Sequence, residues 1–288
     1  MKTLLLFGAI ALSFGLSAQT NNYSLEFDGI DQYIELNNGY DTPEKTIYIS
    51  LKLDSYPIGD LGFLYNAISE NNVVAGLNQI AIRQDSTLGF QVGSNNNQGG
   101  PNTIIPLDQW VNISLSIGSN YSLMYVDGSL VDSVTTSSTP GNSTFDIITF
   151  GCFRSNQATI RFFDGLINRI ALWDYALDSV EINNYIICPP IGTEIGLSGY
   201  WDFEEGTGSI ATDITTNVND GTLTNGPTWS TNVPSYNCNA GIEELANSKK
   251  ELVKIIDLMG RETEFKPNTP LIFVYSDGST ERVMEVED

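Results

Sequence analysis

The sequence predicts an all-β protein in which many short strands form a sandwich or barrel, followed by a small β appendage. Apolar and polar residues alternate with a period of two along most of the chain, as expected for strands with one buried face. Turn dipeptides separate these segments at short intervals, and Asp127-Gly128, between Val126 and Ser129, is the clearest two-residue hairpin signal. Many short strands with such turn spacing are typical of sandwiches and barrels.

The N-terminus has the pattern of a secretory signal peptide. Lys2 supplies a positive charge, and an apolar run from Thr3 to Gly15 follows it. The small residue Ala18 provides a cleavage site, so we predict a signal peptide over residues 1–18. The run is shorter than the roughly 18 unbroken apolar residues that a transmembrane helix needs. We therefore expect a protein that is secreted or held at the outer cell surface, with no transmembrane segment.

The predicted strands of the main domain are rich in β-branched and aromatic residues. They cover residues 23–27, 33–36, 46–53, 79–83, 89–92, 110–117, 122–126, 130–134 and 147–151. A short helix follows these strands in the sequence. Asp178 and Glu181 have the spacing of a capping box, which predicts a helix that begins there and continues to Tyr185.

Composition narrows the classes of function. The formal net charge of −22 disfavours binding to nucleic acid and to anionic membranes, because both are bound mainly by Lys and Arg. Many carboxylates are available to bind divalent cations, although most of the acidic residues are explained by a solvated surface. The chain has no histidine, which excludes Ser-His-Asp and Cys-His nucleophile systems and zinc sites built on imidazole.

The chain contains three cysteines, and disulfides are common in secreted proteins. Cys188 and Cys238 lie on either side of a hairpin-rich segment, whereas Cys152 lies inside an apolar strand pattern. These positions favour a disulfide between Cys188 and Cys238 and a buried thiol at Cys152, and the few other pairings stay open.

The composition changes after Cys238. Residues 241–250 have the character of a polar linker, and a compact unit with strands at 252–258, 271–275 and 282–286 follows it. A sheet of roughly 40 residues is too small to carry chemistry of its own. We therefore assign residues 19–240 to the main domain and residues 241–288 to a separate C-terminal domain.

Three motifs in the main domain resemble a known family. Residues 24–34 (SLEFDGIDQYI), 123–131 (LMYVDGSLV) and 163–173 (FDGLINRIALW) are similar to the opening strand pair, the central hairpin and the closing strand of laminin-G-like domains. These domains belong to the concanavalin A-like lectin/glucanase superfamily. The resemblance covers residues 23–185 and implies a two-sheet jelly-roll sandwich. Residues 199–208 (GYWDFEEGTG) resemble an element that adjoins such domains, which implies a supplementary strand pair within residues 191–240.

The C-terminal domain carries a second resemblance. Residues 255–262 (IIDLMGRE) are similar to the sorting domain that the type IX secretion system of Bacteroidetes-like bacteria recognises. This resemblance implies that residues 241–288 are a sorting domain and that the secretion machinery is a partner of the chain.

The laminin-G-like resemblance also implies a calcium site. Asp28, Asp31 and Asp164 lie in the two motifs that the fold brings together, and carboxylate oxygens suit this ion. The sequence departs from the family pattern at Gln32, and at Asn168 and Arg169, where acids are common in the family. A structural calcium is therefore one expectation, and a purely turn-forming role for Asp28 and Asp164 is the other.

The glucanases of the superfamily place their catalytic carboxylates on one strand, in patterns such as Glu-x-Asp-x-Glu. The nearest match here offers Asp202 and Glu204, but Tyr200 stands where the nucleophile belongs. We therefore expect that the chain is not an enzyme.

We predict a non-catalytic binding or adhesion module for a glycan or an extracellular protein ligand. The alternatives are a glycoside hydrolase or lyase of the same fold and a structural surface protein without a small ligand. Sugar rings stack on exposed aromatic side chains. Tyr40, Tyr56, Tyr65 and Tyr121 lie near loop signals, whereas Trp110, Trp173 and Phe163 fit the core. The sequence does not identify the ligand surface.

Overall fold

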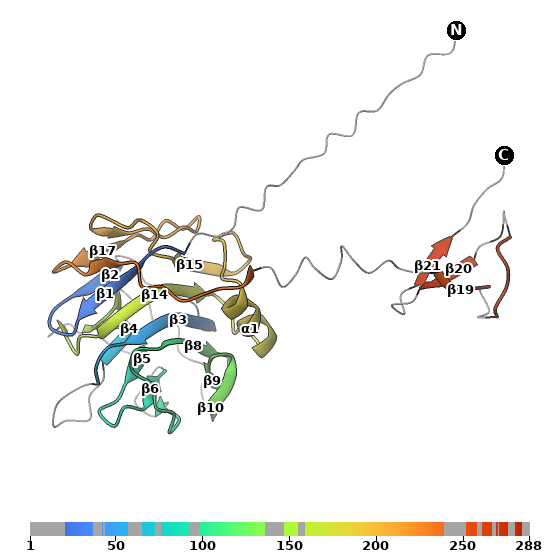
Figure 1. The fold of residues 1–288 in the computed structure, drawn as a ribbon. Helices are drawn as coiled ribbons and strands as arrows, with labels where there is room; N and C mark the ends of the chain where they lie inside the picture. The colour runs from blue at the N-terminus through green and yellow to red at the C-terminus, as the bar shows by residue number, and fades with distance from the viewer. Residues whose placement is uncertain are drawn as a thin grey trace, which may run out of the picture. The chain divides into compact units, whose positions relative to one another are not determined.

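The computed structural model describes residues 21–36, 42, 44–56, 65–72, 76–92, 98–135, 147–154, 159–238, 252–257, 261–266, 269, 271–275 and 280–283. The predicted signal peptide and the predicted linker lie outside these residues. Contacts within the chain divide it into two compact units, Met1–Cys238 and Asn239–Asp288 (Figure 1). The larger unit is a nearly all-β sandwich of antiparallel sheets, so the predicted fold class is confirmed.

The first sheet, which we call sheet A, is built on the long central strands β3 and β14. Its strand order is β10 (Ser129–Thr135), β9 (Tyr121–Val126), β8 (Trp110–Ile117), β3 (Lys45–Leu53), β14 (Asp164–Trp173), β1 (Ser24–Asp28) and β18 (Thr228–Ser230), with β15 (Leu197–Trp201) also paired to β14. The predicted Asp127-Gly128 turn joins β9 to β10, and both turn residues have the positive φ that such a hairpin needs.

The second sheet, sheet B, carries the candidate site described below. Its order is β16 (Ile210–Ala211), β17 (Gly221–Thr224), β2 (Tyr33–Leu36), β11 (Ile147–Phe150), β4 (Tyr65–Asn72), β5 (Gly76–Ile82), β6 (Leu88–Gln91) and β7 (Gln98–Gly99). A separate short pair, β12 (Phe153–Arg154) and β13 (Thr159–Ile160), follows β11.

The main core lies between the two sheets. Its buried residues alternate along strands of both sheets, as in Ile47, Ile49 and Leu51 of β3 and Ile80 and Ile82 of β5. The residues between them therefore point to the outer faces. Phe163 and Trp173 are buried as predicted. Trp110 is only half-buried and donates from Nε1 to Asn232 Oδ1 at 3.2 Å. Its assignment to the core was wrong, because it points to the outer face of sheet A.

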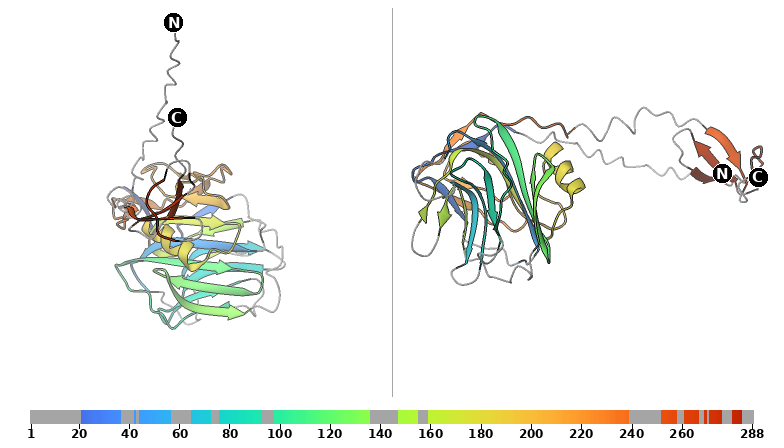
Figure 2. Two further views of the ribbon diagram at one scale, coloured as in Figure 1. Left: turned by 90° about the vertical axis from the view of Figure 1, so that its right-hand side faces the viewer. Right: turned by 90° about the horizontal axis from the view of Figure 1, so that it is seen from below.

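A second cluster of buried residues covers the outer face of sheet A under helix α1 (Ser179–Ile187) (Figure 2). Ile182 of the helix packs there with Trp173 and Tyr200. The predicted capping box is confirmed, since Asp178 accepts from the backbone of Glu181 and the Glu181 side chain accepts from the backbone of Asp178. Sheet A is therefore covered on both faces over this part.

The predicted disulfide is confirmed. Cys188 directly follows α1 and bonds to Cys238, with a Cα–Cα distance of 4.6 Å. Cys152 is a buried free thiol. Burial raises the pKa of this thiol to about 12, while a hydrogen bond with Thr149 opposes the shift. Cys152 is therefore held as an unreactive thiol at physiological pH.

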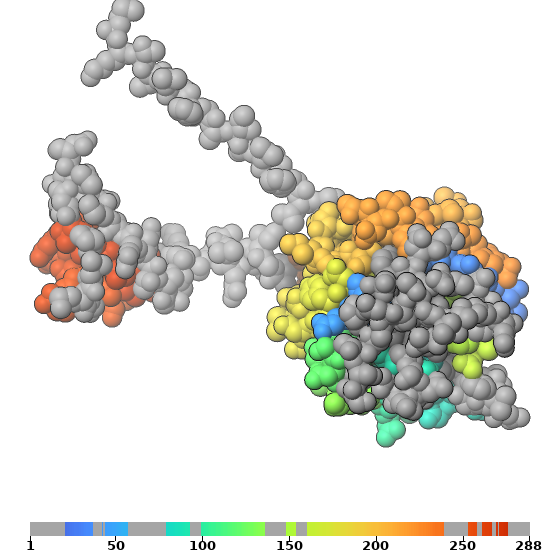
Figure 3. All heavy atoms as spheres, turned by 180° about the vertical axis from the view of Figure 1, so that it is seen from behind, coloured from blue at the N-terminus to red at the C-terminus, as the bar shows by residue number. Residues whose placement is uncertain are grey.

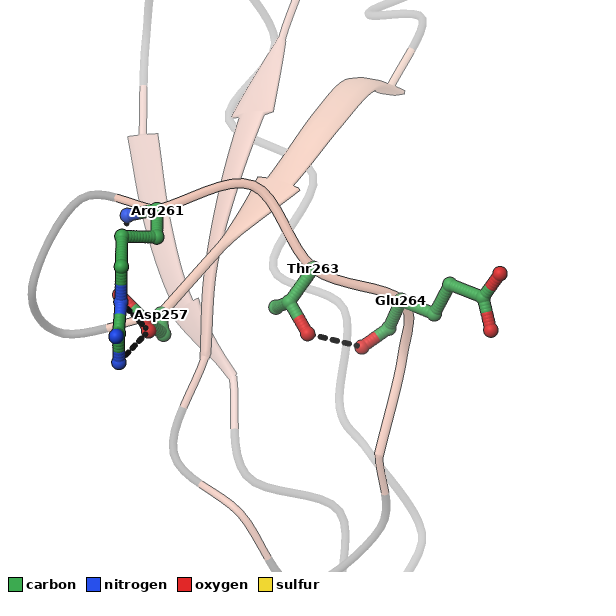
Figure 4. Close-up of polar contacts among 4 residues, drawn as sticks. All are labelled: Asp257, Arg261, Thr263 and Glu264. Carbon is green, nitrogen blue, oxygen red and sulfur yellow. Dashed lines mark hydrogen bonds and ion pairs between the residues drawn. The ribbon is translucent and has the colours of Figure 1, made fainter.

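The smaller unit contains a three-stranded sheet of β19 (Leu252–Ile256), β20 (Leu271–Tyr275) and β21 (Thr280–Val283). Asp257 follows β19 and binds Arg261 by an ion pair of 2.8 Å and by a hydrogen bond from Nε of 2.9 Å (Figure 4). The chain then runs back beside β19, where Thr263 N donates to Ile255 O at 2.9 Å. Phe265 packs edge-on against Phe273, which gives this unit an apolar contact of its own.

Candidate functional site

Four segments meet at one rim of the sandwich, where β1 ends and β14 begins. Asp28 lies directly opposite Asp164 in the β1–β14 ladder. Gly29 N donates to Phe163 O at 3.0 Å, and Phe163 N donates to Gly151 O at 2.8 Å. Asn225, in the turn after β17, donates from Nδ2 to Asp31 O at 2.9 Å. Figure 3 shows the blue N-terminal strands bordered by the orange residues near 220 on one face of the molecule.

The acids predicted to bind calcium lie near this rim, and the carboxylates of two of them, Asp28 and Asp164, make local contacts. Asp28 Oδ1 accepts from Ile30 N at 2.9 Å, as in an Asx turn, and Asp164 accepts from the Ser55 hydroxyl. Burial raises the pKa of the neighbouring Asp54. The charge of Lys52 lowers this pKa, whereas the charge of the Asp164 carboxylate raises it further. Within the described residues, no group of three or more acids is arranged to hold a metal ion. The calcium site at this rim therefore stays a prediction.

The three positions that depart from the family pattern have different surroundings. Gln32 belongs to the rim, where Oε1 accepts from Asp28 N and Nε2 donates to Gly226 O. Asn168 and Arg169 lie further along β14 and face the outer side of sheet A. Arg169 is buried and donates to the Tyr200 hydroxyl at 2.9 Å, and its guanidinium lies 4.2 Å from the Tyr236 ring. These two residues therefore stabilise the cover of sheet A and are not part of the rim.

An aromatic pair lies on the outer face of sheet B beside this rim. Tyr33 of β2 points outward, because its neighbour Ile34 points into the core. Its ring packs against that of Phe162, with a centroid distance of 6.3 Å and an interplanar angle of 40°. Both side chains are half-buried. Thr224 lies opposite Tyr33 in the β2–β17 ladder and is also half-buried, which leaves polar groups next to the rings.

Arg161, the residue before Phe162, adds a charged side chain next to this aromatic pair. Arg161 has a φ of 61°, a left-handed conformation that is uncommon outside glycine and often marks functional segments. Its guanidinium carbon lies 4.8 Å from the centre of the Phe153 ring, within the range of a cation–π contact. Burial lowers the pKa of Arg161. We call Tyr33, Phe153, Arg161 and Phe162 the aromatic rim.

Asp202 and Glu204, the carboxylates nearest to the glucanase pattern, do not lie on one strand. Strand β15 ends at Trp201, and Phe203 has a φ of 55°, so the alternation expected between Asp202 and Glu204 is wrong. Glu204 accepts from the backbone and side-chain nitrogens of Asn22 at 2.8 and 2.9 Å. Burial raises the pKa of Asp202. Glu204 therefore helps to hold the N-terminal segment against the sandwich, while Asp202 Oδ1 accepts from Glu204 N at 3.3 Å.

Of the four tyrosines near loop signals in the sequence, the structure describes the side chains of Tyr56 and Tyr121, and neither belongs to the aromatic rim. Tyr56 packs against the core and donates its hydroxyl to Ile105 O at 2.9 Å. Tyr121 is exposed on β9 of sheet A. Tyr40 and the side chain of Tyr65 lie outside the described residues. Among the described residues, no helix is long and apolar enough to span a membrane.

Solved structures of other proteins have folds similar to that of this chain. The chain is similar to a candidate carbohydrate-binding protein from Bacteroides ovatus, with a TM-score of 0.59 and 16% identity over 74% of this chain and 60% of that chain. It is also similar to the heptameric SAP-like pentraxin of Limulus polyphemus, with a TM-score of 0.54 and 12% identity over 75% of this chain and 97% of the pentraxin. At these identities the similarity establishes the fold alone.

No curated protein matches the chain. The family model described as the concanavalin A-like lectin/glucanases superfamily matches residues 28–183, which is more than half of the sequence. This segment begins at Asp28 of the rim and ends within α1, so it contains most strands of both sheets. The chain belongs to the concanavalin A-like lectin/glucanases superfamily.

Proposed function

We propose that the chain is a secreted, non-catalytic module that binds glycans at the aromatic rim. The observation that carries the proposal is the half-buried Tyr33–Phe162 pair on the outer face of sheet B. Binding sites combine apolar and aromatic surface with a few polar groups that fix orientation. A pyranose ring has an apolar face that stacks on such rings, and its hydroxyls would meet Thr224 and the neighbouring Glu35. The similar fold of the candidate carbohydrate-binding protein supports this proposal.

The polar contacts of Asp202 and Glu204 support the non-catalytic part of the proposal. A retaining glycosidase needs two carboxyl groups about 5 Å apart, one on each side of the scissile bond. Glu204 accepts three hydrogen bonds from Asn22 and Tyr23, so its carboxylate is occupied by the N-terminal segment. Tyr200, at the position of the missing nucleophile, is buried and bonded to Arg169.

The aromatic rim is tested with Tyr33→Ala and Phe162→Ala on a glycan array. For any glycan that the wild-type protein binds, each variant should bind about tenfold more weakly, or about 1.4 kcal/mol, because each loses a stacking ring and its buried area. Tyr121→Ala is the matched control, since it removes an exposed tyrosine from sheet A. Unchanged binding by both rim variants would place the ligand elsewhere, and an array without any bound glycan would favour the structural alternative.

The proposal of secretion through the C-terminal unit is supported by its separation from the sandwich at Cys238. A disulfide at this junction suits an oxidising compartment outside the cytoplasm. In a bacterium with type IX secretion, truncation after Asn239 should leave a folded sandwich in the periplasm, because the sorting signal is lost while the core is complete. Fractionation by immunoblotting measures this result. A truncated protein that still reached the cell surface would contradict the assignment of the tail.

A further inference from the structure

A group of exposed apolar side chains lies beside strand β15 of sheet A. It consists of Ile191, Ile195, Ile214 and Val218, and we call it the apolar patch. The exposed fractions of these four residues range from 39% to 95%. Single apolar residues scattered over a surface are ordinary, whereas a gathered group is typical of an interaction site. The apolar patch is therefore a candidate docking surface.

Two chain segments bring the side chains of the patch together. One segment precedes β15, and the other runs along the free edge of β15, where Ile214 N donates to Tyr200 O at 3.0 Å. A Cβ atom at Gly192 would lie 3.2 Å from Ile214 Cγ1. Further along, Asn217 Nδ2 donates to Ser198 O at 2.8 Å. Because contacts join the two segments at both places, they lie side by side and form one surface.

Val218 is held in a backbone conformation that its own side chain disfavours. Its φ is 53°, in the left-handed region that β-branched residues rarely adopt. The following residue fixes this backbone, since Asn219 N donates to the buried Asp213 Oδ2 at 3.0 Å. Val218 is nevertheless exposed, so its side chain adds little to the core. A strained residue of this kind indicates a role at the surface.

The surroundings of the patch are acidic. Residues 170–248 contain several acids and no lysine or arginine. Glu194 lies within the patch, where its carboxylate accepts from Ile191 N at 2.7 Å and from Gly192 N at 3.0 Å. Burial raises the pKa of Tyr185 on α1, and the charge of Glu194 raises it further. The patch therefore combines apolar side chains with a negative potential.

This charge selects among the possible occupants of the patch. The cations on the adjoining strands β3 and β14, Lys45 and Arg169, are buried and present no positive charge at the surface. A second copy of the chain would bring like charges together, and an anionic membrane would be repelled. A cationic partner gains from charge complementarity and from burial of the apolar side chains.

We propose that the apolar patch docks a cationic polypeptide segment that carries apolar side chains between its lysines or arginines. The patch is remote from the aromatic rim. Strand β14 begins at the rim with Asp164, and its last residues, Ile170–Trp173, pair with β15. At about 3.3 Å per residue the two ends of β14 are about 30 Å apart. Docking at the patch therefore does not depend on the proposed glycan binding and leaves the rim accessible.

The test is fluorescence anisotropy of the full chain with three short synthetic peptides. One peptide is built from Lys and Leu, the second from Lys and Ser, and the third from Glu and Leu. The chain should bind the Lys–Leu peptide about tenfold more tightly than the Lys–Ser peptide, because only the former covers the apolar side chains. It should not bind the Glu–Leu peptide, and salt should weaken the Lys–Leu complex.

Substitutions locate the site. Ile191→Ser and Ile195→Ser should each weaken binding of the Lys–Leu peptide about tenfold, as expected for central contacts of an interface. The weaker binding of the Lys–Ser peptide should not change. Ile104→Ser is the matched control, because Ile104 is another exposed isoleucine, outside the patch. All three variants replace exposed side chains, so their melting temperatures should match that of the wild type.

The contrary outcomes are distinct. Equal affinity for the Lys–Leu and Lys–Ser peptides, or for the Lys–Leu and Glu–Leu peptides, would overturn the proposed partner chemistry. An equal effect of Ile104→Ser would overturn the location. Self-association in sedimentation velocity that is lost in Ile195→Ser would identify a second copy as the occupant. Flotation with phosphatidylcholine vesicles that is lost in the same variant would identify a lipid surface, and either result would replace the inference.

Discussion

Replacement of Cys188 and Cys238 by serine is expected to lower the free energy of unfolding of the sandwich by about 4 kcal/mol. The bond closes a loop with a sequence separation of 50 residues, and the chain-entropy model gives a stabilisation of about this size for such a loop. For a domain of this size the loss corresponds to a fall in melting temperature of about 8–16 °C. Differential scanning calorimetry of the double variant measures it.

The segment that ends at Cys238 explains why the variant should still fold. Asn232 O accepts from Ser24 Oγ at 2.8 Å, and the Tyr236 hydroxyl donates to Asn168 Oδ1 at 2.8 Å. These contacts hold the segment to sheet A without the disulfide. Wild-type protein under reducing conditions is the matched control and should melt at the temperature of the double variant. A double variant that melted within about 2 °C of the oxidised wild type would show that the loop is restrained by other contacts.

Local patterns in the sequence predicted the parts of the fold that are themselves local. The predicted strands 33–36 and 110–117 agree with β2 and β8, because alternation and flanking turn residues fix a strand without reference to its partners. Strand β4 was missed. Its sequence, YNAISENN, has little apolar alternation, and it is a strand because β11 and β5 pair with it on either side.

The candidate site was harder to predict, because the exposure of a residue depends on how the sheets pack. Phe162 and Phe163 are neighbours of the same type, yet Phe163 is buried in the core and Phe162 packs on Tyr33 at the surface. Tyr33 could have been found as the outward residue of an alternating strand. A register shift between Ile167 and Arg169 turns Arg169 to the outer face of sheet A, and no sequence signal indicates this bulge.

A buried carboxylate supports the edge of sheet A, and its loss should be as costly as loss of the disulfide. Asp213 is 2% exposed. Its Oδ1 accepts from Tyr200 N and Thr215 N, and its Oδ2 accepts from Asn219 N, each at 3.0 Å. Ile214 N donates to Tyr200 O at 3.0 Å, so the same loop covers the free edge of β15. Exposed strand edges promote aggregation, and this loop protects one.

Asp213→Ala is therefore expected to lower the free energy of unfolding by about 4 kcal/mol, because it leaves three buried N–H groups without an acceptor and each costs about 1–3 kcal/mol. Asp213→Asn should lose less stability, since its one remaining oxygen still accepts from Tyr200 N and Thr215 N while its amide nitrogen faces Asn219 N.

Asp85 is the matched control. It also accepts hydrogen bonds from a residue two positions ahead, Thr87, but it is exposed, so Asp85→Ala should hardly change stability. Urea unfolding measures all three free energies, and light scattering on heating should detect aggregation earliest in Asp213→Ala. Equal stability of Asp213→Ala and Asp85→Ala would mean that water replaces the carboxylate at this edge.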